Sequence, residues 1–405
     1  MNLTVLECNE PVVETPQECD AFVGLRVERI SDTGRLAALR QPWNALVEDV
    51  PFRRWEWLEA WWRFFATSRD QLTVLAVYDV ADRLVGLAPW YCHRSPIYGR
   101  ELRFLGSGMV CSDYLTIFTA PGAREAVTLS IANWLNTTFR GQWDALELEA
   151  VVADDPTATE LAMRFALAGH VVYRRPALHC WRLELPTEWE EYIKSLSGTR
   201  RNMVRKLIRN RFDSGEAKVC WVETAEELNR GLDILRDLHQ RRRNTLGQPG
   251  CFATPGFDGF LKLVAERFLE LDQLRLQWIE LNGQPVAIEF DLAGGDVVYL
   301  YQSGIEPQAA SDRPGWLGAI AALRRCGEDG YRAFDFMRGD EPYKAHWRAQ
   351  PIALVDLRIT AGQPAARVRQ IIWRGAQRGK LLAKRVRAAW RERGKSDQHK
   401  ATPAE

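Results

Sequence analysis

The chain has 405 residues, of which 46% are hydrophobic and 26% are charged, and its formal net charge is +1. This composition supplies enough apolar material for two or three domains of roughly 150 residues each. It excludes a disordered chain and a small scaffold held together by disulfides. No stretch reaches the ~18 consecutive apolar residues of a membrane span, and the N-terminus has no basic and apolar signal pattern. We therefore expect a cytoplasmic protein.

The eight cysteines form no CxxC pair, and the six histidines have no HxH or HExxH spacing. Such spacings are typical of zinc sites, so we expect reduced thiols and no metal. A cysteine nucleophile remains open, because its histidine partner can be distant in the sequence.

The charge is unevenly distributed. From residue 361 to 405, twelve Lys and Arg stand against three acids, a net charge of +9, so the first 360 residues carry 42 basic and 50 acidic side chains, or −8. Apolar residues recur at near-helical intervals in this tail, at Val368, Ile372, Leu382, Val386 and Trp390. The pattern fits either a basic amphipathic helix in peripheral contact with an anionic membrane or a solvated tail.

In the first half, residues 1–23 show no periodicity and are expected to be a disordered leader. A strand at 22–30 and a helix at 36–47 follow, and then a helix at 51–66 that carries Trp55, Trp57, Trp61 and Trp62. We expect these tryptophans to pack in the core or to form the apolar wall of a cleft. Next come a hairpin (71–94), a strand pair around a Gly-Ser-Gly loop (101–118), a helix ending near residue 170, and strands at 143–151 and 171–185.

The second half repeats this outline with helices at 225–242 and 257–271, hairpin strands at 273–283, 284–294 and 296–305, and a helix at 315–330. Asn282-Gly283 and Gly294-Gly295 are strong hairpin signals. Strands at 331–339 and 353–360 are expected to close this unit. The fold class is therefore mixed α/β (α+β), with two tandem domains of mostly antiparallel sheet flanked by helices. The expected ranges are 24–183 and 184–358, followed by a basic tail at 359–405.

The helix that starts near residue 314 is a candidate anion site. Asp312 is expected to cap it, Pro314 stands near its first position, and Gly315 and Gly318 leave its backbone bare. Free N–H groups and the helix dipole attract negative charge there, and Arg313 adds a cation. Capping alone explains the same residues, so both interpretations stay open.

The segment after this helix carries a second cluster of polar residues. Asp335 and Arg338 end a strand, and Tyr343, Lys344 and Trp347 begin the next element. Polar groups at a strand end beside a helix start are typical of a ligand crevice, although solvated loop residues would look the same.

These residues carry a family resemblance. The order strand, Pro-Gly-Trp-Leu-Gly helix and then FDFMRGDEPYKAHW resembles the GNAT acyltransferase superfamily. Within it, the chain is similar to the FemAB-like tandem branch that includes the CelD-type acetyltransferases of cellulose and exopolysaccharide biosynthesis. The basic segment 195–211 and the segments PFRRWEWLEAWW and FLGSGMVCSDY resemble the same branch.

The resemblance implies tandem GNAT-like domains, with acetyl-CoA or another acyl-CoA bound by the second domain and the first degenerate. It implies a pantetheine-binding strand edge at Gln302, Ser303, Gly304 and Ile305, and a pyrophosphate site at Arg313, Gly315, Trp316, Leu317 and Gly318. The usual Q/R-x-x-G-x-G/A signature is shortened here to Arg-Pro-Gly-Trp-Leu-Gly.

Direct acyl transfer needs a base for the nucleophile and an acid for the leaving thiolate. Tyr343 lies where related enzymes often keep the acid. Asp335 or Glu289 is our candidate base, since a buried carboxylate carries a raised pKa unless it is paired, and an arginine partner is the alternative for Glu289. Arg338 and Lys344 either orient the substrate, together with Trp347, or pair with Asp335 and Glu341.

The basic helix around Arg201 and Arg205 is either solvated or a platform for an anionic substrate. Three functions are therefore open. The first is an acyl-CoA-dependent N- or O-acyltransferase that modifies a sugar or amine in polysaccharide or cell-envelope biosynthesis. The second is an aminoacyl-tRNA-dependent transferase of the FemAB type, disfavoured because a long coiled-coil arm is missing. The third is an inactive scaffold of an exopolysaccharide-synthesis complex.

Overall fold

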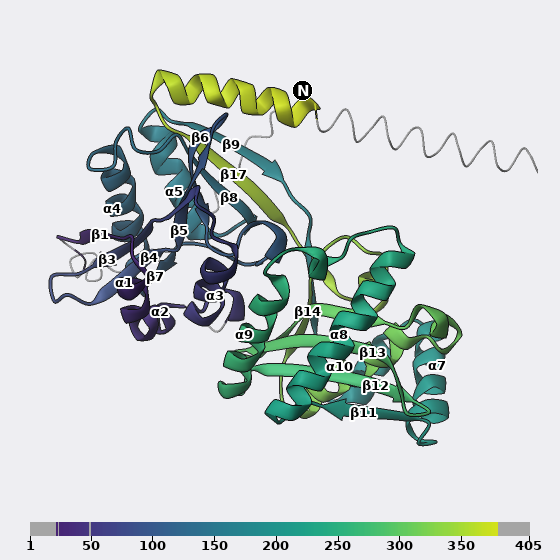
Figure 1. Cartoon of the computed structure of the whole chain (residues 1–405). Coiled ribbons are helices and arrows are strands. Elements are labelled where there is room, and N and C mark those ends of the chain that lie inside the picture. The colour runs from purple at the N-terminus through teal and green to yellow at the C-terminus, as the bar shows by residue number, and fades with distance from the viewer. Residues whose placement is uncertain (1–21, 23, 48–49, 380–405) are drawn as a thin grey trace, which may run out of the picture.

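The computed structural model describes residues 22, 24–47 and 50–379. Two α/β halves follow one another along the chain, and each combines mostly antiparallel sheet with flanking helices (Figure 1). This confirms the expected fold class. The leader expected at 1–23 and the tail beyond residue 379 lie outside the described residues, apart from Phe22.

The N-terminal half begins with β1 and two short helices, and the expected tryptophan-rich helix follows as α3. Its helices are α1 (Thr33–Ala38), α2 (Arg40–Leu46), η2 (Pro51–Arg53), α3 (Trp55–Phe65), η3 (Gly108–Val110), α4 (Arg124–Asn136) and α5 (Pro156–Leu167). Its strands are β1 (Arg26–Ile30), β2 (Asp70–Leu72), β3 (Val74–Tyr78), β4 (Leu84–Ala88), β5 (Trp90–Ser95), β6 (Gly99–Phe104), β7 (Phe118–Thr119), β8 (Ala145–Val152) and β9 (Val171–Pro176).

The C-terminal half contains the helices and hairpins expected around Asn282-Gly283 and Gly294-Gly295. Its helices are α6 (Trp189–Ser195), α7 (Gly198–Leu207), the π-helical turn η4 (Ile208–Phe212), α8 (Ala225–Thr245), η5 (Cys251–Ala253), α9 (Phe257–Glu270), η6 (Pro307–Asp312), α10 (Pro314–Glu328) and α11 (Tyr343–His346). Its strands are β10 (Cys180–Glu184), β11 (Ala217–Trp221), β12 (Leu274–Leu281), β13 (Gln284–Gly294), β14 (Val297–Ile305), β15 (Ala333–Arg338), β16 (Gln350–Ile352) and β17 (Leu354–Thr360).

One strand of the C-terminal half returns to the N-terminal half. Strand β10 pairs with β15 and β16 in the C-terminal sheet, whose order is β11-β12-β13-β14-β15-β10-β16. Strand β17 returns to the N-terminal sheet, whose order is β2-β5-β6-β8-β17-β9. The expectation that residues 353–360 close the second unit was therefore wrong, and the expected boundary at residues 183 and 184 cuts through β10. Pairing partners depend on register across the whole chain, which local patterning does not specify.

The strand pair expected around the Gly-Ser-Gly loop was also wrong. Strand β6 lies in the six-stranded sheet, whereas the short β7 joins the separate sheet β1-β3-β4-β7. The residues between them form η3 and a loop with two left-handed residues, Cys111 and Tyr114. This loop, residues 105–117, reaches the C-terminal half.

An aromatic interface joins the halves where α3 packs against α9 (Figure 1). The fully buried Trp57 contacts Phe260 and Tyr301 of the C-terminal half at ring-centroid distances of 5.1 and 4.8 Å. Arg267 of α9 donates to the Glu59 carboxylate at 2.6 Å. The tryptophan-rich helix is therefore core, as one of the two expected interpretations held, and this core is shared by both halves.

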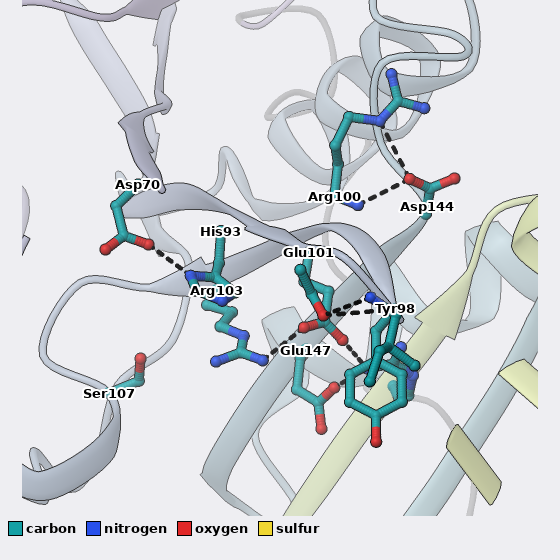
Figure 2. Close-up of polar contacts among 12 residues, drawn as sticks. Asp70, His93, Tyr98, Arg100, Glu101, Arg103, Ser107, Asp144 and Glu147 are labelled. Atoms are coloured by element: carbon teal, nitrogen blue, oxygen red, sulfur yellow. Dashed lines mark hydrogen bonds and ion pairs between the residues drawn. The ribbon is translucent and has the colours of Figure 1, made fainter. Parts of the chain in front are cut away.

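A helix at residues 364–379 lies across the N-terminal sheet near β6, β9 and β17 (Figure 1). Beneath it, Arg358 of β17 donates to the buried carboxylates of Glu101 and Glu147. Figure 2 shows Glu101 also accepting from Arg103, and Asp144 accepting from the backbone and side chain of Arg100. Because each buried carboxylate has a cationic partner, the network meets the requirement for burying charge.

Replacing Trp57 with alanine should destabilise the whole chain. The substitution removes a large buried ring and leaves Ser112 without the indole N–H that donates to it at 2.7 Å. We expect a loss of about 3–5 kcal/mol in the free energy of unfolding, measured by urea denaturation. Trp62→Ala, on the partly exposed face of the same helix, is the matched control and should cost clearly less; equal losses would contradict the assignment of Trp57 to the shared core.

Candidate functional site

The sheet of the C-terminal half opens at the expected strand edge. Strands β14 and β15 run parallel but pair only from Val297 to Tyr299 on β14. Beyond that point β14 stays paired with β13 as far as Ile305, while within the described residues it has no strand partner on its other side. The expected pantetheine-binding residues 302–305 lie on this open stretch. An unpaired strand edge offers N–H and C=O groups to an extended ligand.

Gly304 lets a helix pack closely behind this strand. A Cβ at position 304 would stand 2.7 Å from the backbone nitrogen of His239 on α8. Ser303 is exposed, and Gln302 and Ile305 are half-buried. The strand is therefore held from behind by α8 while its edge remains accessible.

Helix α10 begins beside this edge. Pro314 is its first residue, as expected, but the residue before it, Arg313, occupies the N-cap position in a left-handed conformation (φ 57°). The expectation that Asp312 caps the helix was wrong, because its carboxylate instead accepts from Arg211 at 2.6 Å. The amides of Trp316 and Leu317 donate back to the Arg313 carbonyl.

Gly315 is the exposed position of this first turn. A Cβ added to it would meet only Ile305, at 3.9 Å. Pro314 has no N–H, so the Gly315 amide is the group of this turn that points outward without a partner among the described residues. Leu317 is fully buried and Trp316 packs against Trp347 at 4.5 Å, so their side chains serve packing.

The basic segment meets the same helix start. Arg211 of η4 bonds to Asp312, and Arg313 contacts Met203 of α7. Arg205 pairs with Glu190 at 2.8 Å, and Arg201 donates to the Lys194 carbonyl at 3.1 Å. Residues about one hundred positions apart thus place a cationic helix next to the N-terminus of α10, which strengthens its attraction for anions.

Glu289 lies beneath the first turns of α10. On β13, Ile288 and Phe290 join the core on the α8 side, so the alternating Glu289 faces α10. A Cβ at Gly318 would stand 3.0 Å from its carboxylate, and Gln277 donates to it at 3.2 Å. An arginine partner was the alternative expectation, and no cation pairs with Glu289 among the described residues. Burial raises its pKa to about 7.

Asp291 stands two residues further along the same face of β13. One of its carboxylate oxygens is buried without a hydrogen-bond partner. Burial and the neighbouring Glu289 raise the pKa of Asp291 well above its usual value. Burial therefore disfavours the charged form of both acids, and Glu289 is the one that lies against the first turns of α10.

Tyr343 opens α11 with its ring against Phe336. The side chain is 42% exposed, and its hydroxyl has no hydrogen-bond partner among the described residues. Loss of hydration around the hydroxyl raises the pKa of Tyr343, and the carboxylates of Glu341 and Glu289 raise it further. A phenol that stays protonated and is free to donate suits a general acid.

Asp335 is fully occupied by other groups. It accepts from the Tyr114 hydroxyl at 2.5 Å, from Arg182 at 3.0 Å and from the Met337 amide at 2.8 Å. Burial raises its pKa despite these donors. A carboxylate with three donors and no exposed surface is a structural group, so Glu289 remains the better candidate base.

Arg338 and Lys344 are also engaged within the protein. Arg338 pairs with Asp113 of the loop 105–117 at 3.0 Å, not with Asp335. Lys344 is 2% exposed, donates to the Met337 and Gly339 carbonyls and pairs with Glu341. Buried Trp347 packs on Trp316. Of the expected substrate-binding residues, these three shape the site from within.

Sequence analysis missed one pair beside the open edge. His239 donates from Nδ1 to the Ser303 carbonyl at 3.0 Å, and its Nε2 faces Cys251 Sγ at 3.3 Å. Burial raises the pKa of Cys251 to about 12 and lowers that of His239, so both are neutral. The pair shows no sequence spacing that would have revealed it.

A cavity of about 240 Å³ lies along α10 and contains none of the expected site residues. It is lined by Phe212, Val219, Trp221, Ile320, Ala321, Arg324, Arg325 and Glu328. Because this cavity holds none of the expected site residues, we place the candidate site at the open edge of β14 and the N-terminus of α10. No group of three or more His, Cys, Asp or Glu side chains that could hold a metal occurs in the described part of the chain.

One family model matches within the C-terminal half. Residues 198–345 match the model described as the acetyltransferase (GNAT) domain. No curated protein matches the sequence.

Solved structures share the two-domain fold. The crystal structure of FemX superposes with a TM-score of 0.58 at 9% identity, over 84% of this chain and 99% of that one. A conserved protein of unknown function from Bacteroides thetaiotaomicron VPI-5482 gives 0.52 at 12% identity, over 83% and 100%. A tandem GNAT protein from the clavulanic acid biosynthesis pathway gives 0.44 at 11%, over 84% and 99%. The superposition on FemX confirms the expected FemAB-like fold.

Glu289→Gln should change how stability depends on pH. A carboxyl whose pKa is raised from 4.5 to about 7 by folding binds its proton more tightly in the folded state, so its contribution to stability is lost as pH rises between these values. The free energy of unfolding of the variant minus that of wild type should therefore be larger at pH 8 than at pH 4, by up to about 3 kcal/mol.

Chemical unfolding of both chains at each pH measures this difference, and groups common to both chains cancel. A difference that does not vary with pH would contradict the raised pKa of Glu289.

Proposed function

We propose that the chain is an acyltransferase that uses acetyl-CoA or another acyl-CoA as donor. It transfers the acyl group directly to an amine or hydroxyl of a saccharide or another small acceptor in polysaccharide or cell-envelope synthesis. The observation that carries this proposal is the meeting of three features at one place: the open edge of β14, the bare first turn of α10 and the cationic helix α7. The GNAT match over the same residues supports it.

Each feature suits a different part of the donor. The edge of β14 at residues 302–305 offers backbone groups to the amide-containing pantetheine arm. The outward amide of Gly315 and the cations Arg313 and Arg211 suit the pyrophosphate. The donor supplies an activated thioester carbonyl. The chain has to bind and orient the donor and the acceptor, and to move protons between them.

Two side chains near the start of α10 suit the proton transfers. Glu289, with a pKa of about 7, can accept the proton of the attacking amine or hydroxyl as its bond to the acyl carbon forms. Tyr343 can donate its proton to the thiolate that leaves. Asp335 takes no part in either step, because Arg182 and Tyr114 hold it.

An aminoacyl-tRNA donor is the second candidate, favoured by the exposed cations on α7 and η4. Arg205, Lys206 and Arg209 are exposed on this segment and would suit an RNA phosphate backbone. The connection between α8 and α9 is short, residues 246–256, and no coiled-coil arm occurs among the described residues. An inactive scaffold would bind neither donor.

Binding of the donor can be tested without knowing the acceptor. Titration calorimetry with acetyl-CoA, a long-chain acyl-CoA and CoA should show binding that Arg313→Ala weakens about tenfold, or by about 1.4 kcal/mol. Arg324→Ala is the control, because Arg324 lies on the same helix α10 but pairs with Glu328. Absence of binding to all three compounds would refute the acyl-CoA proposal and direct the test to aminoacyl-tRNA.

Tyr343→Phe should lower turnover about 10²-fold and leave the melting temperature unchanged, since the hydroxyl makes no hydrogen bond in the described structure. Thiol release from acyl-CoA, followed with a thiol reagent in the presence of an acceptor found by screening, measures turnover. Undiminished turnover would remove Tyr343 from the mechanism.

A further inference from the structure

The C-terminal helix (residues 364–379) is fixed to the N-terminal half along one face. Ala366, Gln370 and Trp373 are buried at spacings of four and three residues. Gln370 accepts from Arg358 at 2.9 Å, and the Arg358 guanidinium stands 4.6 Å from the Trp373 ring centre. Because the buried Arg358 makes both contacts, this face of the helix is docked on the N-terminal half.

The opposite face exposes aliphatic side chains. Val368, Ile371 and Ile372 are 57%, 71% and 48% exposed. Ile371 and Ile372 follow Val368 by three and four residues, so both lie next to it on the helix surface. Contiguous exposed apolar surface is rare on proteins unless it binds a partner or a membrane.

Cations flank one side of this apolar stripe. Arg367, Arg374 and Arg378 are exposed on the same helix. Arg367 and Arg140 also line a cavity of about 570 Å³ at the foot of the helix. Leu167, which is 82% exposed, directly precedes the cavity residue Ala168. Aliphatic groups flanked by arginines suit a surface that is both apolar and negatively charged.

We propose that this helix docks the protein on an anionic lipid bilayer, with Val368, Ile371 and Ile372 entering the boundary between headgroups and acyl chains. The arginines would face the lipid phosphates. Charge complementarity selects this partner over a nucleic acid, because exposed aliphatic side chains gain nothing from a phosphate backbone. The sequence beyond residue 379 continues with Lys380, Lys384, Arg385 and Arg387. No described helix is long and apolar enough to cross a membrane.

Vesicle flotation of the full chain tests the proposal. Wild type should bind vesicles of phosphatidylcholine with about 40% phosphatidylglycerol, and binding should fall as salt rises from about 0.1 to about 0.5 M. Ile371→Glu should weaken binding about tenfold. Val80→Glu is the matched control, since Val80 is an exposed aliphatic residue (82%) in the turn after β3, and should bind like wild type.

Equal binding of wild type and Ile371→Glu, equal binding to pure phosphatidylcholine, or no binding by wild type would each overturn the proposal. If Ile371→Glu lowers the melting temperature, the double variant Ile371→Ser, Ile372→Ser replaces it in the same comparison. The membrane proposal is independent of the proposed acyl donor. The donor titration uses no lipid, so either proposal can fail while the other stands.

Discussion

The contact of the loop 105–117 with the end of β15 is the constraint on which the candidate site depends. Tyr114 and Asp113 reach from the N-terminal half to Asp335, the last residue of β15 that pairs with β14, and to Arg338 beyond it. Burial raises the pKa of Asp113 to about 6 even though it pairs with Arg338. Charges buried in this way are costly to separate, since removing one partner leaves the other uncompensated. The N-terminal half thereby fixes the position of β15, one of the two strands that diverge at the open edge.

The return of β17 and the aromatic interface both join the two halves. Because β17 follows the C-terminal half along the chain and pairs between β8 and β9, the six-stranded sheet of the N-terminal half is complete only with the end of the chain. Trp57 fills the space between the halves and contacts Tyr301, whose hydroxyl donates to the Val110 carbonyl of the loop. An apolar interface, together with a strand that returns to the first half, disfavours motion of one half against the other. The two halves are therefore one scaffold for a single open edge.

Charge is divided between two distant regions with different roles. Around the start of α10, cations of α7 and η4 are exposed to solvent. Beneath the helix lie two buried acids, Glu289 and Asp291, that have no cationic partner among the described residues. This arrangement separates a group that attracts an anion from a group that handles a proton. On the N-terminal half, by contrast, the carboxylates Glu101 and Glu147 are neutralised by arginines and serve to dock the C-terminal helix.

Local features followed from the sequence alone. The hairpins at Asn282-Gly283 and Gly294-Gly295, the start of α10 at Pro314 and the apolar helix α3 depend on residues within a few positions of each other, where backbone preference and periodicity act. Only the tertiary structure decided which segments meet. Asp335 was one of two candidate bases, yet Tyr114, 221 positions away, donates to it. Arg338 pairs with Asp113, and β17 crosses to the other half. Such partners are selected by packing across the whole fold, and no spacing along the chain records them.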